Sequence, residues 1–385
     1  RNTIAVKVEN KTPSSRWYSG SGIYRSVDLN IVNPVHVDLY GTKVETPNLE
    51  TEKDGAVTTN IKTTVANDSD REQNVTLTHT IFKKGGEPSA NIGTVTTETK
   101  AIAAGETAAI DATVNAQNPE LWSTTNPALY TVRTEVKIGE EVVDTYDTEY
   151  GFRYFKFDEN SGFSLNGTNM KLKGVCMHHD QGALGAEAWK RAIERQVEIL
   201  KEMGCNSIRV THNPAAEELI NICNEKGILV VEEMFDGWQN AKNGNNNDYA
   251  RFFKEWMEKD VRSWIRRDRN HPSVIMWSIG NEIPDTHADA HGQEITRSLL
   301  AVVRKWDYRK VAPVTIGSNY MPWENAQKCA DIVKVAGYNY AEKYYAEHHE
   351  KHPDWIIYGS ETSSVVQSRG VYHFPVERAY LIEAD

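Results

Sequence analysis

The sequence predicts an antiparallel β-sandwich followed by a (β/α)8 TIM barrel, a multidomain fold of the β plus α/β class. Apolar and polar residues alternate through the first half of the chain, whereas apolar runs separated by helical periodicity fill the second half. Period-two alternation is typical of half-buried strands, and strands that alternate with helices favour a parallel sheet. The length of 385 residues suits two to three domains. Hydrophobic residues make up 39% of the chain, as in ordinary globular proteins.

Residues 34–154 are expected to form the sandwich. β-Branched residues occupy alternate positions from 57 to 65, and apolar residues follow the same period from 75 to 81, on either side of the turn-rich residues 67–69. Repeated short strands of this kind fit a two-sheet antiparallel sandwich of about 100 residues.

Residues 1–33 hold two further strand-like runs, at 4–8 and 27–31. Two strands are too few to form an independent sheet. We therefore expect the chain to begin inside an earlier domain.

Residues 155–385 are expected to form the barrel. Apolar strand-like runs alternate with helix-length segments, and the runs lie at residues 170–175, 208–210, 228–231, 274–277, 314–316, 332–335 and 355–358. Such alternation implies parallel strands joined by right-handed crossovers. No G-x-G-x-x-G motif follows the first run, which favours a closed barrel over an open nucleotide-binding sheet. Because a barrel needs eight strands, the last strand–helix unit is expected to be missing.

Two of the intervening helices have clear signatures. Apolar residues at 189, 193, 197, 200 and 203 form one stripe of the helix after the first run, and residues 252, 256, 261 and 264 form a stripe of the helix before the fourth. Gly227 is expected to end the helix between them.

Polar residues follow nearly every run, at the strand ends where the active sites of barrels lie. They are His178, His179, Asp180, Arg209, His212, Asn213, Glu232, Glu233, Asp236, Asn281, Glu282, Tyr338, Asn339, Tyr340 and Glu361. Carboxylates, imidazoles, amides and aromatic rings are thus expected to meet on one rim. This set contains no cysteine nucleophile and no phosphate-binding loop.

Two carboxylates stand out on this rim. Glu282 and Glu361 each follow an apolar run through a step of small residues, after the fourth and seventh strands. Strands three places apart in an eight-stranded ring face each other across its mouth. Cleavage of a glycosidic bond requires such a pair, one carboxyl as proton donor and one as nucleophile or base. The alternative is that both are surface charges, as most glutamates are.

Three further residues have roles around this pair. Arg209 can hold Glu361 ionised, because an adjacent cation lowers a carboxyl pKa, or it can form a purely structural ion pair. Asn281 can donate to a sugar 2-hydroxyl. Tyr340 can hydrogen-bond the nucleophile or pack as an ordinary aromatic residue.

The other rim residues are weaker candidates. His178 and His212 can bind substrate hydroxyls or serve as satisfied structural groups. Asp180 and Asp236 complete the set of candidate substrate-binding residues. One rim carboxylate is expected to be a core ion-pair partner instead, and its spacing does not identify it. The candidates for that role are Glu232, Glu233 and Asp236.

The remaining features narrow the possible partners. A formal net charge of −11 argues against nucleic-acid binding. No run of 18 apolar residues is present, so no transmembrane helix or membrane partner is expected, and no signal peptide is visible. The cysteines lack C-x-x-C spacing, which predicts buried thiols rather than a zinc site; they are Cys176, Cys205, Cys223 and Cys329. No metal or other cofactor is expected at the site, while a structural or activating cation stays open.

Short motifs extend along nearly the whole chain, at residues 15–25, 121–130, 150–153, 166–175, 209–214, 281–282 and 361. In this order they resemble the motifs of glycoside hydrolase family 2, the family of β-galactosidases, β-glucuronidases and β-mannosidases. The resemblance implies that residues 1–33 are the end of a jelly-roll sugar-binding domain. It further implies that residues 34–154 are immunoglobulin-like and that residues 155–385 are the catalytic barrel.

The resemblance also implies a retaining exo-glycosidase that removes terminal β-linked sugars from a glycoside or oligosaccharide. Glu361 would form the glycosyl-enzyme, and Glu282 would protonate the leaving group and then activate water. Residues 337–340 and 360–364 are most similar to the β-galactosidase branch. β-Glucuronidase and β-mannosidase activity stay open, as does a non-catalytic carbohydrate-binding protein. The family implies a soluble bacterial protein of the cytoplasm or periplasm that often forms homo-oligomers.

Overall fold

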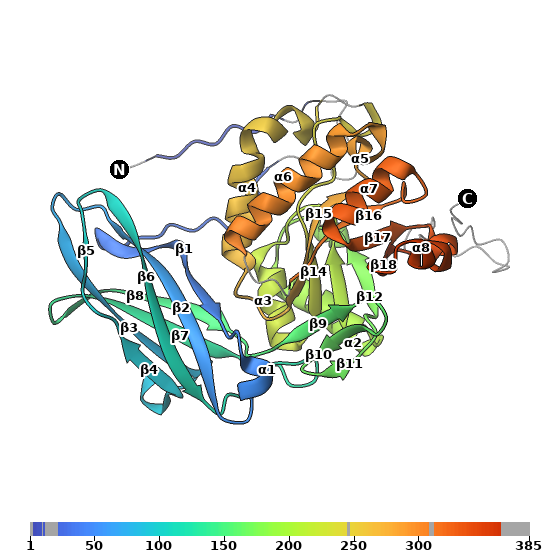
Figure 1. The fold of residues 1–385 in the computed structure, drawn as a ribbon. Coiled ribbons are helices and arrows are strands. Elements are labelled where there is room, and N and C mark those ends of the chain that lie inside the picture. Colours follow the sequence, from blue (N-terminus) through green and yellow to red (C-terminus); the bar gives the residue numbers. More distant parts are fainter. Residues whose placement is uncertain (1–2, 10, 12–21, 245–246, 308–311, 363–385) are drawn as a thin grey trace.

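The computed structural model describes residues 3–9, 11, 22–244, 247–307 and 312–362. Figure 1 shows an antiparallel β-sandwich beside a curved parallel sheet that carries helices on its outer face. Most of the motif at residues 15–25 and the region expected to follow the seventh barrel strand lie outside the described residues, as do residues 363 and 364. No described helix is long and apolar enough to cross a membrane.

Two antiparallel sheets form the sandwich. One consists of β1 (Val35–Glu45), β2 (Ala56–Asn67) and β6 (Glu106–Gln117), with the short helix α1 (Leu49–Glu52) between β1 and β2. The other has the order β4 (Gly93–Thr96), β3 (Gln73–Lys83), β7 (Tyr130–Ile138) and β8 (Glu141–Tyr150), with β5 (Lys100–Ile102) also paired to β3. The predicted alternation is confirmed, because Val65 of β2 and Val75 and Leu77 of β3 share one buried cluster.

The two strands predicted at residues 4–8 and 27–31 are wrong. Neither run is part of a sheet, and the apolar side chains are exposed, with 88% of Ile4 and 82% of Leu29 accessible to solvent. A strand is stable only with a ladder partner, and none of the described residues provides one for these runs. The segment around Arg25 lies against the barrel instead.

The barrel sheet contains seven described parallel strands in chain order, so each strand pairs with the next. They are β12 (Gly174–Met177), β13 (Ser207–Val210), β14 (Leu229–Glu233), β15 (Val274–Asn281), β16 (Val314–Ser318), β17 (Val335–Asn339) and β18 (Ile356–Glu361). A small antiparallel sheet precedes them and consists of β9 (Phe155–Asp158), β10 (Gly162–Leu165) and β11 (Thr168–Asn169).

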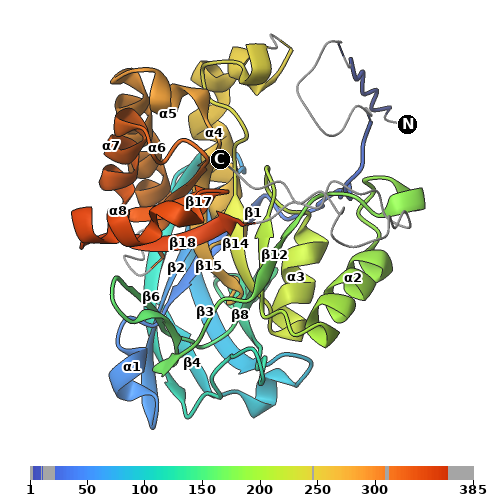
Figure 2. The same ribbon diagram turned by 90° about the vertical axis from the view of Figure 1, so that its right-hand side faces the viewer.

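Helices cover the outer face of the barrel sheet, and Figure 2 shows α2 and α3 on one side and α5 to α8 on the other. The helices are α2 (Lys190–Glu202), α3 (Glu217–Lys226), α4 (Phe253–Asp268), α5 (Pro284–Ala288), α6 (His291–Trp306), α7 (Glu324–Val333) and α8 (Tyr345–Lys351). Single 3-10 turns lie at Pro88–Ala90, Gly182–Leu184, Lys242–Gly244, Tyr249–Arg251 and Glu342–Tyr344.

Two predicted strand boundaries in the barrel are wrong. Ile332 and Val333 belong to the end of α7, and the next strand starts at Val335. The sequence pattern does not reveal this boundary, because both the helix residue Val333 and the strand residue Val335 are buried and apolar. The first barrel strand starts only at Gly174, and residues 170–173, which are predicted to belong to it, connect the preceding small sheet to this strand.

The predicted helices are present, with a difference at their ends. Gly227 ends α3 in the left-handed conformation, with φ at 70°, as predicted. The middle of the α2 stripe is buried, whereas Trp189 (52%) and Met203 (66%) are exposed. These two residues cap the helix, where the stripe no longer faces the sheet. Residues 252 and 256, at the start of α4, are exposed in the same way.

The sandwich contacts the end of the barrel at which the strands begin. Arg153, which follows the sandwich, donates to the backbone oxygens of His271 at 3.4 Å and Val274 at 2.8 Å. The indole N–H of Trp122 donates to the backbone oxygen of Asn224 at 2.9 Å. The opposite end of the barrel, where the strands finish, carries the polar residues singled out from the sequence.

Candidate active site

Arg209 is the centre of the polar cluster at the ends of the barrel strands. It lies near the end of β13, and its guanidinium reaches three other strands. Nη1 donates to Oε1 of Glu361 at 2.9 Å, while Nη2 donates to Oε2 of Glu233 at 2.7 Å and to Oδ1 of Asn281 at 3.0 Å. Only 5% of Arg209 is exposed. Strand ends that lie up to 152 positions apart in the chain therefore meet at one buried cation.

Both carboxylate oxygens of Glu361 are engaged. Oε1 lies 2.9 Å from Arg209 and 3.6 Å from Nε2 of His212, and the hydroxyl of Tyr340 donates to Oε2. Burial raises the pKa of Glu361, but the charge of Arg209, the Tyr340 hydroxyl and His212 outweigh it, so the pKa is lowered. Glu361 is therefore held as a carboxylate at neutral pH, in the state that a nucleophile needs.

Glu282 lies directly after β15 and is held by the two following strands. It adopts a left-handed backbone conformation with φ at 47°, which is strained for a residue other than glycine. Its backbone N–H donates to the carbonyl of Gly317 at 2.7 Å. Its Oε1 accepts from Nδ2 of Asn339 at 3.1 Å. This backbone turn and this amide together orient the carboxyl group.

Asn339 connects the two candidate catalytic carboxylates. Besides Glu282, its Nδ2 donates to Oδ1 of Asn281 at 2.9 Å, which in turn accepts from Arg209. Its Oδ1 accepts from the hydroxyl of Ser360 at 2.6 Å, next to Glu361 in β18. A continuous hydrogen-bonded chain of side chains thus runs from Glu282 to Arg209, the residue that binds Glu361.

Asn281 and Asp236 are bound to each other. Nδ2 of Asn281 donates to Oδ1 of Asp236 at 2.9 Å, and this oxygen also accepts from Nζ of Lys242. Lys242 donates in addition to the backbone oxygen of Asn281 at 2.9 Å. Nδ2 of Asn281 carries two hydrogens, of which Asp236 takes one. Asp236 therefore positions the amide for which a contact with the sugar is predicted.

Glu233 is the core ion-pair partner that the sequence left open among three carboxylates. It is fully buried, and it accepts from Arg209 at 2.7 Å and from Ser278 at 2.7 Å, while its Oε1 lies 2.8 Å from Nδ1 of His212. Burial raises the pKa of Glu233, but Arg209, His212 and Ser278 outweigh it and lower the pKa to about 2. Because His212 contacts Glu233 through Nδ1, its Nε2 is directed at Glu361.

Two family models match this chain. The model of glycosyl hydrolases family 2 matches residues 39–153, and the model of the family 2 TIM barrel domain matches residues 158–365. The chain belongs to glycoside hydrolase family 2.

Relatives of this family-2 chain are considerably longer. A β-galactosidase of Bacteroides ovatus, BoGH2A, is 39% identical, and the match covers 99% of this chain and 47% of that protein. A crystal structure of a family 2 member from Bacteroides cellulosilyticus has a TM-score of 0.86 and 37% identity over 92% of this chain and 44% of that one. A Bacteroides uniformis β-glucuronidase structure has a TM-score of 0.72 and 27% identity over 87% and 42%. The family-2 chain thus spans less than half the length of each of these proteins.

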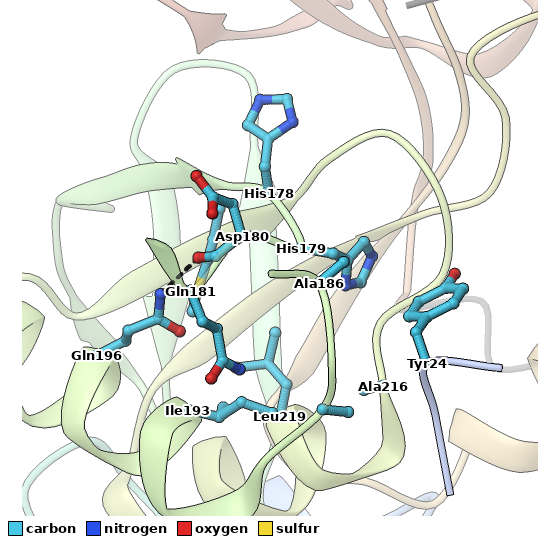
Figure 3. A pocket seen from close by; sticks show the side chains of 12 residues that line it. Tyr24, His178, His179, Asp180, Gln181, Ala186, Ile193, Gln196, Ala216 and Leu219 are labelled. Carbon is cyan, nitrogen blue, oxygen red and sulfur yellow. Dashed lines mark hydrogen bonds between the residues drawn. The ribbon is translucent and has the colours of Figure 1, made fainter. Parts of the chain in front are cut away.

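His178 adjoins the cluster through His212. Its ring packs edge-on against the ring of His212, with centroids 5.2 Å apart. Figure 3 shows the His178 ring pointing away from Gln196 and Leu219, which line the small pocket behind this loop. His178 is thus positioned next to His212, which contacts Glu233 and Glu361.

The next two residues of this loop have local roles. His179 points toward Tyr24, with ring centroids 6.2 Å apart, and burial lowers the pKa of His179 to about 4. Asp180 is exposed, its Oδ1 accepts from the N–H of Gly182 at 2.8 Å, and its backbone oxygen accepts from Gln196 at 2.9 Å. These contacts shape the turn after β12, so the role of Asp180 in the structure is local to this loop.

Four residues of this site have no role predicted from the sequence, and they are Asn339, Ser278, Lys242 and Ser360. Asn339 ends β17, so the strand-end rule that identified its neighbours was the available signal. Ser278 lies inside the buried strand β15, and nothing in its sequence surroundings marks it as a ligand of Glu233.

The cysteines do not form a common site. Among the described residues all are free thiols, with Cys223 and Cys329 buried as predicted and Cys176 and Cys205 only partly buried. Sγ of Cys176 donates to the backbone oxygen of Ser360 at 3.1 Å, so this thiol supports the strand that carries Glu361. Within the described ranges no group of three or more histidine, cysteine, aspartate or glutamate residues has the arrangement of a metal site.

Proposed function

We propose that this chain hydrolyses terminal β-linked glycosides by a double displacement, with Glu361 as nucleophile and Glu282 as acid/base. The observation that carries the proposal is the setting of Glu361, whose two oxygens are bound by Arg209 and Tyr340 while a lowered pKa keeps it charged. Glu282 is connected to the same cluster through Asn339. One charged carboxylate and one independently oriented carboxyl are what glycosidic cleavage needs.

In the first step, Glu361 attacks the anomeric carbon and forms an ester bond to it as the bond to the leaving oxygen breaks. Glu282 gives its proton to that oxygen. In the second step, Glu282 takes a proton from water, whose oxygen bonds to the anomeric carbon and releases the carboxylate of Glu361. Arg209 and Tyr340 stabilise this carboxylate as it departs, because its charge returns beside a cation and a hydroxyl donor.

A β-galactoside is the substrate that we propose first. The named activity of the Bacteroides ovatus relative supports it, since that protein is called a β-galactosidase. A β-glucuronide is the second candidate, because the similar structure from Bacteroides uniformis is that of a β-glucuronidase. A β-mannoside is the third candidate. The presence of both carboxylates and of their hydrogen-bonded partners favours an enzyme over a non-catalytic carbohydrate-binding protein.

We propose the domain assignment on the same basis. Residues 1–33 would end a jelly-roll domain, residues 34–154 would form an immunoglobulin-like domain and residues 155–385 the catalytic barrel. The family models at residues 39–153 and 158–365 support the division between the second and third units.

A panel of 4-nitrophenyl β-glycosides tests the function, with galactoside, glucuronide and mannoside as substrates. We expect one of them to be turned over and Glu361→Gln to abolish turnover while binding of the sugar is retained, because only the nucleophile is lost. Glu350→Gln on the exposed face of α8 is the matched control and should keep full activity. No turnover of any glycoside by the unmodified chain would contradict the proposal.

A further inference from the structure

Three aromatic rings gather on the rim of the barrel next to Glu282. His287 lies in α5, and Tyr320 and Trp323 lie in the turn between β16 and α7. The ring centroid of His287 is 3.9 Å from that of Tyr320 and 4.8 Å from that of Trp323, and the last two are 5.5 Å apart. We call these three residues the aromatic cluster.

The backbone holds the aromatic cluster in place. The N–H of Tyr320 donates to the hydroxyl of Ser318 at 2.9 Å, and the N–H of Trp323 donates to the backbone oxygen of Tyr320 at 2.9 Å. Nδ2 of Asn325 reaches the backbone oxygen of His287 at 3.4 Å. The turn after β16 and the helix α5 are thus joined into one surface.

The cluster is packed on one side and open on the other. Trp323 is 54% exposed, whereas tryptophan side chains in folded proteins are mostly buried. Burial lowers the pKa of His287, so its ring is neutral and behaves as an uncharged aromatic surface at neutral pH. Rigid, preorganised aromatic rings with an exposed face are typical of ligand-binding surfaces.

The cluster lies on the side of the site that carries the proposed proton donor. Glu282 is two residues before α5, and its N–H donates at 2.7 Å to Gly317, which is in the strand that leads to Tyr320. The acid must protonate the oxygen of the leaving group, so the leaving group departs on this side. Glu361 comes from β18, three strands away from β15 in the described sheet.

We propose that the aromatic cluster binds the leaving-group sugar of the substrate by stacking Trp323 on its pyranose ring. The inference rests on the proposed function and adds a preference for oligosaccharides over glycosides with small leaving groups. A pyranose ring presents a face of C–H groups that packs on an aromatic ring as other apolar surface does. Binding energy gained there is available to the reaction because the leaving group is held while its oxygen is protonated.

The test compares two substrates with the same glycone, one of which has no leaving-group ring. For galactose these are lactose and β-galactosyl fluoride; for another glycone, the corresponding disaccharide and fluoride. Trp323→Ala should lower kcat/KM for the disaccharide by about tenfold, which corresponds to the loss of one aromatic contact. Hydrolysis of the fluoride should be unchanged. Trp323→Tyr, which keeps a ring, should retain most of the disaccharide activity.

Trp256→Ala is the matched control, because Trp256 is 43% exposed on α4 and is not part of the aromatic cluster. It should affect neither substrate. Equal losses on disaccharide and fluoride after Trp323→Ala, or no loss on either, would overturn the inference while leaving the proposed function intact. Failure of the unmodified chain to hydrolyse either substrate would instead contradict the proposed function itself.

Discussion

Glu232 and Glu233 are neighbours on β14, and both are fully buried, yet they lie in opposite electrostatic surroundings. Glu233 faces the interior of the barrel, where it binds Arg209. Glu232 faces the layer between the strand and the helices, where its Oε1 accepts from the N–H of Ala215 at 2.8 Å and lies 3.7 Å from Arg267. We call these surroundings the inner and the outer side of β14.

The pKa values of the two carboxyl groups are shifted in opposite directions. Burial raises the pKa of Glu233, but Arg209 and His212 outweigh it, so the pKa is lowered. Burial also raises the pKa of Glu232, and the nearby Asp268 raises it further, so the pKa is raised. Arg267 offsets only part of this, since it is bound to Asp268. Burial alone therefore does not decide the charge of these carboxyl groups. The decisive difference is the contact with the cation, because Arg209 donates to Glu233 at 2.7 Å whereas Arg267 lies 3.7 Å from Glu232 and is bound to Asp268.

Arg209→Met removes the cation on the inner side of β14 and should have the largest effect on both stability and turnover. Glu233 and Glu361 would then be buried without a counter-charge, which costs about 3–5 kcal/mol of the free energy of unfolding. We also expect kcat/KM to fall at least about a thousandfold, since Glu361 loses its charge stabilisation. Urea unfolding and aryl glycoside kinetics measure the two effects. Arg195→Met, at an exposed position on α2, is the matched control, and wild-type turnover by Arg209→Met would contradict the role of the inner cation.

Glu233→Gln sharpens the comparison by removing the inner charge and keeping the shape of the side chain. Breaking the buried pair should cost about 3 kcal/mol of stability at pH 7. The folded pKa of Glu233 is about 2, below the ordinary 4.5, so its contribution is present above pH 4.5 and is lost as the pH falls toward 2. The difference in melting temperature between variant and wild type should therefore shrink in acid. A difference that does not change with pH would contradict the ionised inner carboxylate.

Glu232→Gln is the outer counterpart and should have the smallest effect on turnover, because Glu232 is bound to Ala215 and lies near Arg267 on the outer side of β14. The folded pKa of Glu232 lies above the ordinary 4.5, so the folded wild type holds an extra proton and loses stability as the pH rises from 4.5 through the folded pKa. Glutamine cannot ionise, so the free energy of unfolding of the variant should rise relative to that of the wild type as the pH increases. The expected gain is about 1.4 kcal/mol for each pH unit between 4.5 and the folded pKa of Glu232. Melting temperatures at several pH values measure this. A variant that becomes less stable than the wild type at alkaline pH would show instead that Glu232 is ionised and paired with Arg267.

The sequence predicts which residues lie at the carboxyl ends of the barrel strands, but not which face of a strand each side chain occupies. Arg209, Glu282 and Glu361 were predictable because parallel strands place the residues at their carboxyl ends on one edge. The choice between Glu232 and Glu233 was not, since a shift of one residue in register exchanges the two faces of β14. Only the position of Arg209 relative to that strand decides which glutamate it meets.

The failures of prediction have a related cause. The runs at residues 4–8 and 27–31 have a strand pattern but no ladder partner among the described residues, and pattern alone does not supply one. The contacts of Asn339 and of the aromatic cluster depend on loop geometry, including the left-handed backbone at Glu282 and Tyr340. Such conformations are uncommon outside glycine and have no clear signal in the surrounding residues.

The most direct test of the proposed mechanism is to identify the residue that bonds to the sugar. A 2-deoxy-2-fluoro glycoside of the preferred sugar, with a good leaving group, slows the second step and traps the glycosyl-enzyme. Mass spectrometry of the digested protein should then find the sugar on the peptide that contains Glu361. A sugar attached to Glu233 or Glu282, or turnover of ordinary substrates without any covalent adduct, would contradict the assignment of Glu361 as nucleophile.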